Sequence, residues 1–178
     1  RFARAIHRNF VDVPLADQAA ALAALGARFP ALDTTRVGVF GWSFGGTLAA
    51  AAVLRRPEVF HAAVAVAPVV DWRDYDTHYT ERYLGTPQDE PAAYVRSSLV
   101  TDGATTAPLR LTRPLLLMHG TADDNVYFFH SLKLIAALVR AGQDVDFTPL
   151  VGETHSVREP AMVVQVYARV VDYLKTNL

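Results

Sequence analysis

The sequence predicts an α/β fold built around a parallel sheet, because strand-like segments alternate along it with segments of helical period. Its length supports a single domain of ordinary size, since 178 residues, 51% of them hydrophobic, can bury a substantial core. Its composition excludes disorder, because only 20% of the residues are charged and the net charge is -1. We therefore expect one compact α/β layer structure.

The first half of the chain contains two predicted helices and two predicted strands. One apolar stripe marks a helix that Pro30 ends, formed by Leu15, Leu22, Leu25 and Phe29. Residues 36–40 form a short buried strand, and residues 44–56 form an Ala-rich helix that Pro57 stops. Residues 62–67 alternate Ala and Val and give the second strand. Residues 69–113 show no clear period, and we expect them to be irregular.

The second half returns to a regular pattern. Residues 114–118 are the third strand, and Gly142 caps a helix with the stripe Phe128, Leu132, Ile135 and Val139. Residues 145–151 are the fourth strand. Pro160 lies near the start of a last helix, whose apolar face is Val163, Tyr167, Val170 and Leu174. Four strands with interleaved helices amount to half of a doubly wound sheet.

Several classes of function are excluded by what the sequence lacks. It has no cysteine, which rules out disulfides, thiolate catalysis and any site with a cysteine metal ligand. It has no apolar run near the ~18 residues of a membrane span. A net charge of -1 offers no electrostatic footprint for nucleic acid or an anionic membrane. The chain begins at Arg1 without Met or a signal-peptide pattern, so we expect a piece of a longer protein.

Residues 41–46, Gly-Trp-Ser-Phe-Gly-Gly, lie between a predicted strand and a predicted helix. This is the setting of a nucleophile elbow, in which a sharp turn projects a serine above the sheet and glycines avoid clashes with nearby backbone. Ser43 is thus the candidate nucleophile. The N–H of Phe44, at the start of the helix, is placed to stabilise an oxyanion. A Gly-rich turn with an incidental serine is the alternative interpretation.

A serine nucleophile needs a histidine base and an acid, and on this kind of sheet they follow in the order serine, acid, histidine. Asp123 comes after the third predicted strand and His155 after the fourth, both at carboxyl ends of strands where ligands bind. Spacing leaves Asp124 open as a rival acid and Glu153 as a weaker one. The remaining histidines are less well placed in this order: His7, His61, His78, His119 and His130.

These motifs resemble the C-terminal part of the catalytic domain of the prolyl oligopeptidase family of serine peptidases, most closely its dipeptidyl peptidases. The similarity runs from about residue 5 to the end and includes the elbow, residues 66–69, residues 79–85 and residues 119–126. The resemblance implies the C-terminal half of an α/β-hydrolase fold, so that residues 1–178 would be one partial domain lacking its N-terminal strands. It also implies that Asp123, the first of the Asp pair, is the acid.

The resemblance further implies a substrate pocket. Its walls, which would accept the proline or alanine before the scissile bond and exclude long polar side chains, are Val69, Trp72, Tyr75, Tyr79 and Val126. Asn125 would hydrogen-bond a backbone carbonyl of the substrate. An aromatic cluster with a purely structural role under a long loop is the alternative for Trp72 and the tyrosines.

Together these features predict a serine peptidase that works through an acyl-enzyme with Ser43, Asp123 and His155 and needs no metal or organic cofactor. The expected partners are a peptide substrate and the N-terminal remainder of the parent chain, including a propeller domain, with homo-oligomers possible. We expect this segment alone to be inactive, because the second oxyanion donor would lie upstream. The alternatives are an esterase or acylaminoacyl peptidase on the same scaffold, or a non-catalytic interaction module.

Overall fold

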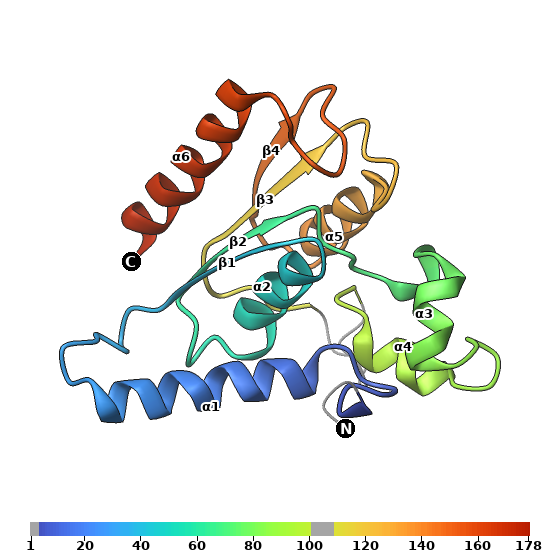
Figure 1. The fold of residues 1–178 in the computed structure, drawn as a ribbon, viewed down its shortest axis with the longest axis horizontal. Helices are drawn as coiled ribbons and strands as arrows, with labels where there is room; N and C mark the ends of the chain where they lie inside the picture. Colours follow the sequence, from blue (N-terminus) through green and yellow to red (C-terminus); the bar gives the residue numbers. More distant parts are fainter. Residues whose placement is uncertain (1–3, 101–108) are drawn as a thin grey trace.

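The computed structural model describes residues 4–100 and 109–178, and within them it shows a four-stranded parallel sheet (Figure 1). The strands are β1 (Gly38–Trp42), β2 (Ala62–Val66), β3 (Leu115–Gly120) and β4 (Asp146–Leu150). They lie side by side in chain order, and each neighbouring pair is parallel. The predicted α/β class with four parallel strands is confirmed.

Helices cover both faces of this sheet (Figure 1). One face packs against α1 (Asp12–Arg28), α2 (Phe44–Arg55) and α5 (Phe129–Arg140), and the other packs against α6 (Pro160–Asn177). The alternation of β2 shows the division, since Ala63 and Ala65 face the first layer while Val64 and Val66 face α6. Sheets that are buried on both faces in this way have nearly continuous apolar strands.

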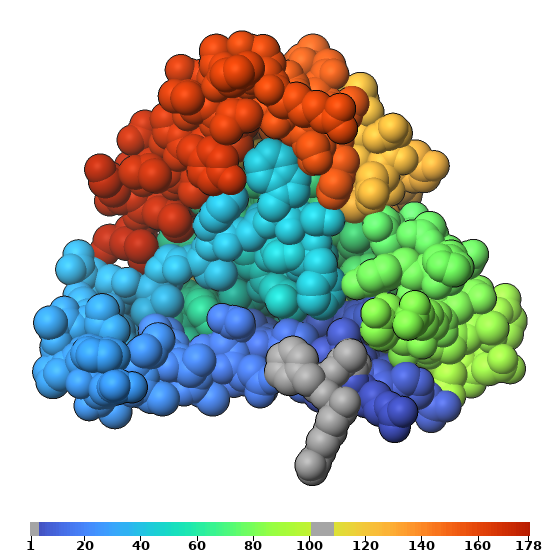
Figure 2. Space-filling view, viewed as in Figure 1, coloured from blue at the N-terminus to red at the C-terminus, as the bar shows by residue number. Residues whose placement is uncertain are grey.

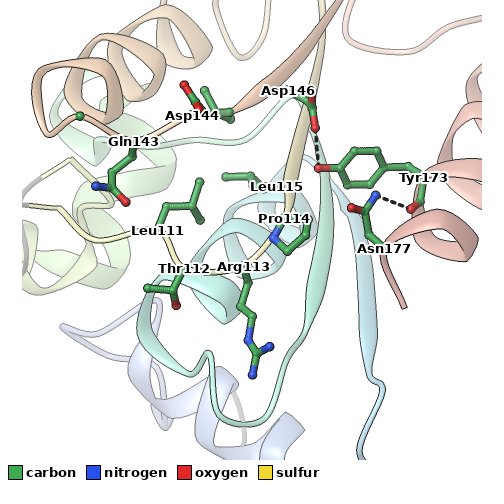
Figure 3. A pocket seen from close by; sticks show the side chains of 12 residues that line it. Leu111, Thr112, Arg113, Pro114, Leu115, Gln143, Asp144, Asp146, Tyr173 and Asn177 are labelled. Carbon is green, nitrogen blue, oxygen red and sulfur yellow. Dashed lines mark hydrogen bonds between the residues drawn. The ribbon is translucent and has the colours of Figure 1, made fainter.

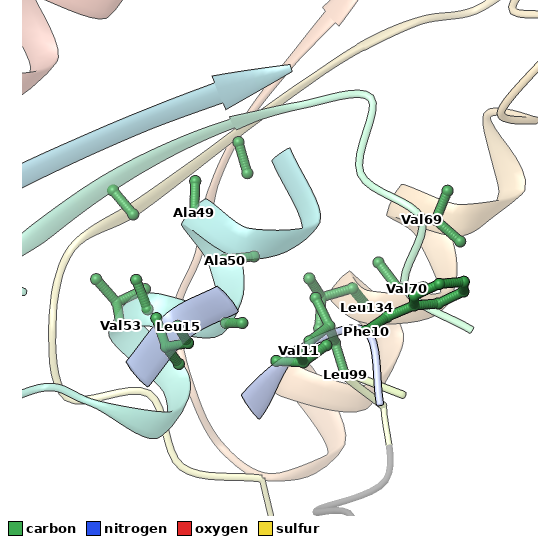
Figure 4. Close-up of a cluster of buried hydrophobic side chains, with 14 of the residues drawn as sticks. Phe10, Val11, Leu15, Ala49, Ala50, Val53, Val69, Val70, Leu99 and Leu134 are labelled. Carbon is green, nitrogen blue, oxygen red and sulfur yellow. The ribbon is translucent and has the colours of Figure 1, made fainter. Parts of the chain in front are cut away.

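Small side chains bring α2 close to the sheet. Its residues 49–52 are all alanines and are almost completely buried, so the helix backbone can approach β1 and β2 closely. The same core extends to Phe10 and Val11 just before α1, to Leu15 within α1, and to Leu134 of α5 (Figure 4). This packing fixes the amino end of α2, directly after Ser43, against the sheet.

The prediction that residues 69–113 are irregular is wrong for much of the described part. This segment contains a short 3₁₀ helix, η2 (Trp72–Asp74), and two short helices, α3 (Thr77–Leu84) and α4 (Pro91–Ser97). The side chains of Asp71 and Asp76 cap the first two by accepting backbone N–H groups. Helices of seven or eight residues span about two turns, too few to show a periodic stripe. Residues 101–108 of this segment, like residues 1–3 at the start of the chain, lie outside the described residues.

The first strand begins two residues later than expected and is not buried throughout. Phe40, on β1, is 36% exposed, whereas every residue of β2 and β3 is buried. The sheet order explains the difference, because β1 has a neighbouring strand on one side only within the described structure. Figure 2 shows the cyan residues of β1 and the turn that follows it at the surface, in the middle of that face of the molecule.

The predicted apolar stripes of α5 and α6 are partly wrong. Leu132 and Val139 of α5 are 44% and 63% exposed, and the buried face is formed instead by His130, Ser131, Leu134 and Leu138. Tyr167 of α6 is 49% exposed, although its neighbours Val166 and Val170 are buried. In α5 two polar residues, His130 and Ser131, occupy core positions. A prediction based on apolar residues alone therefore places the buried face of this helix incorrectly. Among the described residues no helix has the length and apolar character needed to span a membrane.

The two leucines of α5 provide a matched test of this orientation. Leu138→Ala removes a side chain with 0% exposure and should lower the free energy of unfolding by about 2–5 kcal/mol. Leu132→Ala changes the same residue type on the exposed face and should cost about 0.5 kcal/mol or less. Urea unfolding of the two variants measures both values. Equal losses would contradict the orientation of α5 described here.

Candidate active site

Ser43 lies in a strained turn between β1 and α2. Its backbone angles are φ 59° and ψ -122°, a combination that non-glycine residues rarely adopt. Two backbone hydrogen bonds hold the turn, one from Ser43 N to Val66 O (2.9 Å) and one from Thr47 N to Ser43 O (3.0 Å). Strain of this kind persists only where the surroundings impose it, and functional sites are where it commonly occurs.

Two of the glycines around Ser43 are required by close backbone contacts. A Cβ atom on Gly41 would lie 2.0 Å from the carbonyl oxygen of Gly45, and one on Gly46 would lie 2.5 Å from that of Val66. Both distances are shorter than any Cβ contact allows, so only glycine fits. Gly45 differs, because a Cβ there would meet nothing within 4 Å. The elbow therefore depends on the first and last glycines of the motif for steric reasons.

Ser43, His155 and Asp123 form a continuous chain of hydrogen bonds. The His155 Nε2 atom lies 3.0 Å from Ser43 Oγ, and His155 Nδ1 lies 2.8 Å from Asp123 Oδ2. The three residues follow β1, β4 and β3 respectively, so they meet at the carboxyl edge of the sheet. Asp123 is buried, while its rival Asp124 is exposed. The arrangement can take a proton from the serine hydroxyl and stabilise the resulting imidazolium.

The carboxylate of Asp123 is held by four donors. Its Oδ1 accepts the backbone N–H groups of Asn125 (3.0 Å) and Val126 (2.9 Å), and its Oδ2 lies near both His155 and His119. Burial alone would raise the pKa of Asp123. The hydrogen bonds from His119, His155 and the Asn125 backbone outweigh burial and hold the pKa well below its usual range. Asp123 is therefore an ionised acceptor at neutral pH.

His119 is the residue of this site that sequence reasoning missed. It was set aside because it precedes the acid in the chain, yet it is completely buried and its Nε2 lies 3.2 Å from Asp123 Oδ2. The available signal was its place in β3, close before the acid-bearing turn, where a polar side chain in a buried strand needs a partner.

The loop that carries His155 is fixed by contacts with two other elements. The indole Nε1 of Trp42 donates to the His155 carbonyl oxygen (2.9 Å), and Gly152 N donates to Thr121 Oγ1 (2.9 Å). Gly120 lets the loop approach β3, because a Cβ there would lie 2.3 Å from Glu153 O. Trp42, which precedes Ser43, and Gly120, at the end of β3, thus position His155.

The expected pocket residues belong to one aromatic cluster. Trp72 contacts Tyr75 and Tyr79, with ring centroids 5.7 and 6.1 Å apart, and the two tyrosines are 5.7 Å apart. The ring centroid of Phe44, next to Ser43, lies 5.9 Å from that of Trp72. Phe10 and Tyr83, which sequence analysis did not single out, complete the cluster, and Phe10 lies 4.4 Å from Trp72. The cluster therefore joins the elbow on one side.

The remaining pocket candidates connect this cluster to the acid. Tyr75 donates its hydroxyl hydrogen to Asn125 Oδ1 (2.9 Å). The side-chain NH₂ group of Asn125 is not used in this bond and can donate to another group. Val69 and Val126 are buried, and the Val69 carbonyl accepts from Thr47 Oγ1 of α2 (2.9 Å). Burial is the main cause that raises the pKa of the Tyr75 hydroxyl, with the charges of Asp76 and Asp123 adding to it.

Phe44 is the first residue of α2, where backbone N–H groups have no partner within the helix. This N–H adjoins Ser43 at the positive end of the helix, which suits it to an anion formed next to the serine. In the described part of the chain, no three His, Asp or Glu side chains are grouped so as to hold a metal ion.

A cavity of about 570 Å³ lies at the opposite edge of the sheet (Figure 3). It is lined by the starts of β3 and β4 and the end of α6, including Leu115, Asp146 and Asn177. Figure 3 shows Tyr173 bonded to Asp146 at its side, through a 2.8 Å hydrogen bond. The cavity is at the amino ends of the strands, so it is separate from the site of Ser43.

Comparison with known proteins agrees with this geometry. Human dipeptidyl peptidase 8 is 38% identical over 178 residues, covering 100% of this chain and 20% of the relative, and the mouse protein of the same name is 37% identical with the same coverage. The crystal structure of Porphyromonas gingivalis dipeptidyl peptidase 4 superposes with a TM-score of 0.83 at 36% identity, covering 94% of this chain and 23% of that one. A crystal structure from Bacteroides ovatus gives a TM-score of 0.90 at 32% identity, covering 98% and 24%.

The chain spans about a fifth of the length of the curated relatives it matches. The family model that it matches extends over residues 1–178 and is described as the prolyl oligopeptidase family. The match covers the strained elbow and the acid and histidine turns together. This chain belongs to the prolyl oligopeptidase family.

Proposed function

We propose that the protein containing this chain is a serine peptidase of the dipeptidyl peptidase type. The observation that carries the proposal is the unbroken hydrogen-bonded series Ser43, His155, Asp123 beside the N-terminus of α2. The family and the names of the relatives support the same reaction. In this proposal the described residues supply the nucleophile, the base, the acid and one oxyanion donor.

The geometry assigns a role to each residue. Ser43 Oγ attacks the scissile carbonyl while His155 Nε2 accepts its proton, and the resulting imidazolium passes that proton to the leaving amine. Asp123 holds the Nδ1–H of His155 and stabilises its positive charge. The N–H of Phe44 binds the oxyanion of the tetrahedral intermediate. Water then hydrolyses the acyl-enzyme with His155 as base.

The aromatic cluster supports a preference for proline or alanine before the scissile bond. Flat rings of Trp72, Tyr75 and Tyr79 favour a small apolar group, and they offer no anionic partner to a lysine. The Asn125 amide is placed to donate to the substrate backbone. An ester hydrolase or acylaminoacyl peptidase would use the same three catalytic residues, but the Tyr75–Asn125 pair beside the acid favours a peptide.

We also propose that the remainder of the protein completes the site. The relatives are about five times as long as this chain, which leaves room for a second oxyanion donor and for a domain that binds the amino terminus of the peptide. A propeller domain and a homo-oligomer fit the same proposal.

The nucleophile can be identified by covalent labelling of the whole protein. A fluorophosphonate probe should modify Ser43, and Ser43→Ala should abolish labelling and lower kcat by about 10⁶ with little change in folding. Ser156→Ala, a change to an exposed serine next to the base, is the matched control and should label normally. Mapping the adduct to another serine would refute the assignment.

The two neighbouring aspartates distinguish the acid. Asp123→Asn preserves shape but presents an N–H to His155, and should lower kcat by about 10⁴. Asp124→Asn makes the same change on an exposed side chain and should leave kcat nearly unchanged. Steady-state kinetics on one chromogenic peptide substrate measures both. A larger effect at Asp124 would reverse the choice of acid.

Pocket specificity can be measured on matched peptides with Pro, Ala, Leu or Lys before the scissile bond. We expect kcat/KM to favour Pro and Ala over Leu by about 10–200-fold, the usual discrimination of an apolar pocket. Lys should be rejected more strongly, because the rings leave its charge without a partner. Equal rates on Lys and Pro would contradict the proposed pocket.

A further inference from the structure

The acid of the site is shared by two serine–histidine pairs. On one side lie Ser43 and His155, and on the other lie Ser131 and His119, both completely buried. His119 Nε2 is 3.2 Å from Asp123 Oδ2, and His119 Nδ1 is 2.7 Å from Ser131 Oγ. The second pair has no route to substrate, since neither side chain has any exposed surface.

The surroundings of His119 determine which nitrogen carries its proton. Nε2 faces only acceptors, the carboxylate of Asp123 and the Val126 carbonyl oxygen at 2.7 Å, so it must donate. Nδ1 faces the Ser131 hydroxyl, which can donate to it. A hydrogen on Nε2, shared between its two acceptors, and none on Nδ1 gives each of these groups a partner. The edge of Phe128 packs against the ring, with ring centroids 5.6 Å apart.

We propose that His119 is a positioning residue for the acid, and that Ser131 fixes its tautomer. The one Nε2–H of His119 is shared between the Val126 carbonyl oxygen (2.7 Å) and Asp123 Oδ2 (3.2 Å), and Oδ2 is also the oxygen that receives the Nδ1–H of His155. His119 therefore orients the Asp123 carboxylate from the buried side and stabilises part of its negative charge. This inference rests on the proposed function, since it assigns His119 to the reaction in which Asp123 acts.

Several titratable groups interact with this series and bear on a pH measurement. In the described structure they include Asp123 and His155 themselves, His130 of α5 through its charge interaction with His119, and the Tyr75 phenol through that with Asp123. His130 provides a matched control, because it is also completely buried and accepts a backbone hydrogen bond, from Val70 N at 3.2 Å, without touching the acid.

The test uses the whole protein with four variants: His119→Leu, His119→Gln, Ser131→Ala and His130→Leu. His119→Leu should lower kcat about ten- to hundredfold, the equivalent of one hydrogen bond to a charged group, with KM changed less than about twofold. The acid limb of the kcat/KM profile should move to higher pH, because the hydrogen bond from His119 helps to lower the pKa of Asp123 and its loss raises that pKa.

The other variants separate positioning from a general structural role. His119→Gln keeps an N–H donor near the Nε2 position and should restore most of kcat and the original acid limb. Ser131→Ala should give a smaller loss of the same kind. His130→Leu should lower the melting temperature about as much as His119→Leu, with the acid limb unchanged.

Unchanged kcat and an unchanged acid limb in His119→Leu would overturn this inference, provided that Ser43→Ala has abolished activity in the same preparation. The same conclusion would follow if His130→Leu shifted the acid limb equally. Full activity in Ser43→Ala would instead overturn the proposed function, and this inference with it.

Discussion

The parallel register of the sheet is the constraint on which the site depends. Trp42, Val66, Met118 and Thr148 occupy one level across the four strands. Because all strands run in the same direction, every turn that follows this level opens at the same edge. Ser43, Asp123 and His155 lie in three such turns. Residues far apart in the sequence therefore come together although each lies directly after its own strand. The opposite edge, with its cavity beside Asp146, receives none of them.

Close packing of the backbone around the three turns brings their side chains to hydrogen-bond distance. Gly41 and Gly46 let the elbow pack against α2 and β2, and Gly120 lets the histidine loop pack against β3. The indole N–H of Trp42, next to Ser43, then donates to the backbone carbonyl of His155. The Ser43 turn and the His155 loop are thus joined by the Trp42 side chain as well as by the contact between Ser43 Oγ and His155 Nε2. A side chain at any of these three glycines would push apart the backbone segments that pack there.

Local signals are enough to predict most of the scaffold and to single out Ser43, Asp123 and His155, which the structure brings into contact. Strand-like runs of Ala, Val and Leu marked β2 and β3, and a glycine-flanked serine between strand and helix marked the elbow. The role of Asp123 over Asp124 came from family resemblance, because spacing alone does not distinguish neighbours. A polar residue at the end of a buried strand signals that His119 needs a partner, but its pairing with Ser131 depends on contacts between β3 and α5, which no local pattern records. The same applies to α3 and α4, which are too short to show a period, and to Phe10, whose partners are 34 or more residues away.

Phe10 packs against the buried side of the aromatic cluster. It has no exposed surface and contacts Phe44, Trp72, Tyr79 and Tyr83. Its own backbone is tied to the Ser97 hydroxyl of α4 (3.2 Å). A smaller or larger residue at position 10 would therefore change the depth available behind Trp72 and Tyr79 without altering any of the proposed pocket residues. In the proposed peptidase, selectivity could thus change through a residue that precedes the first helix, while the rings of the pocket stay the same.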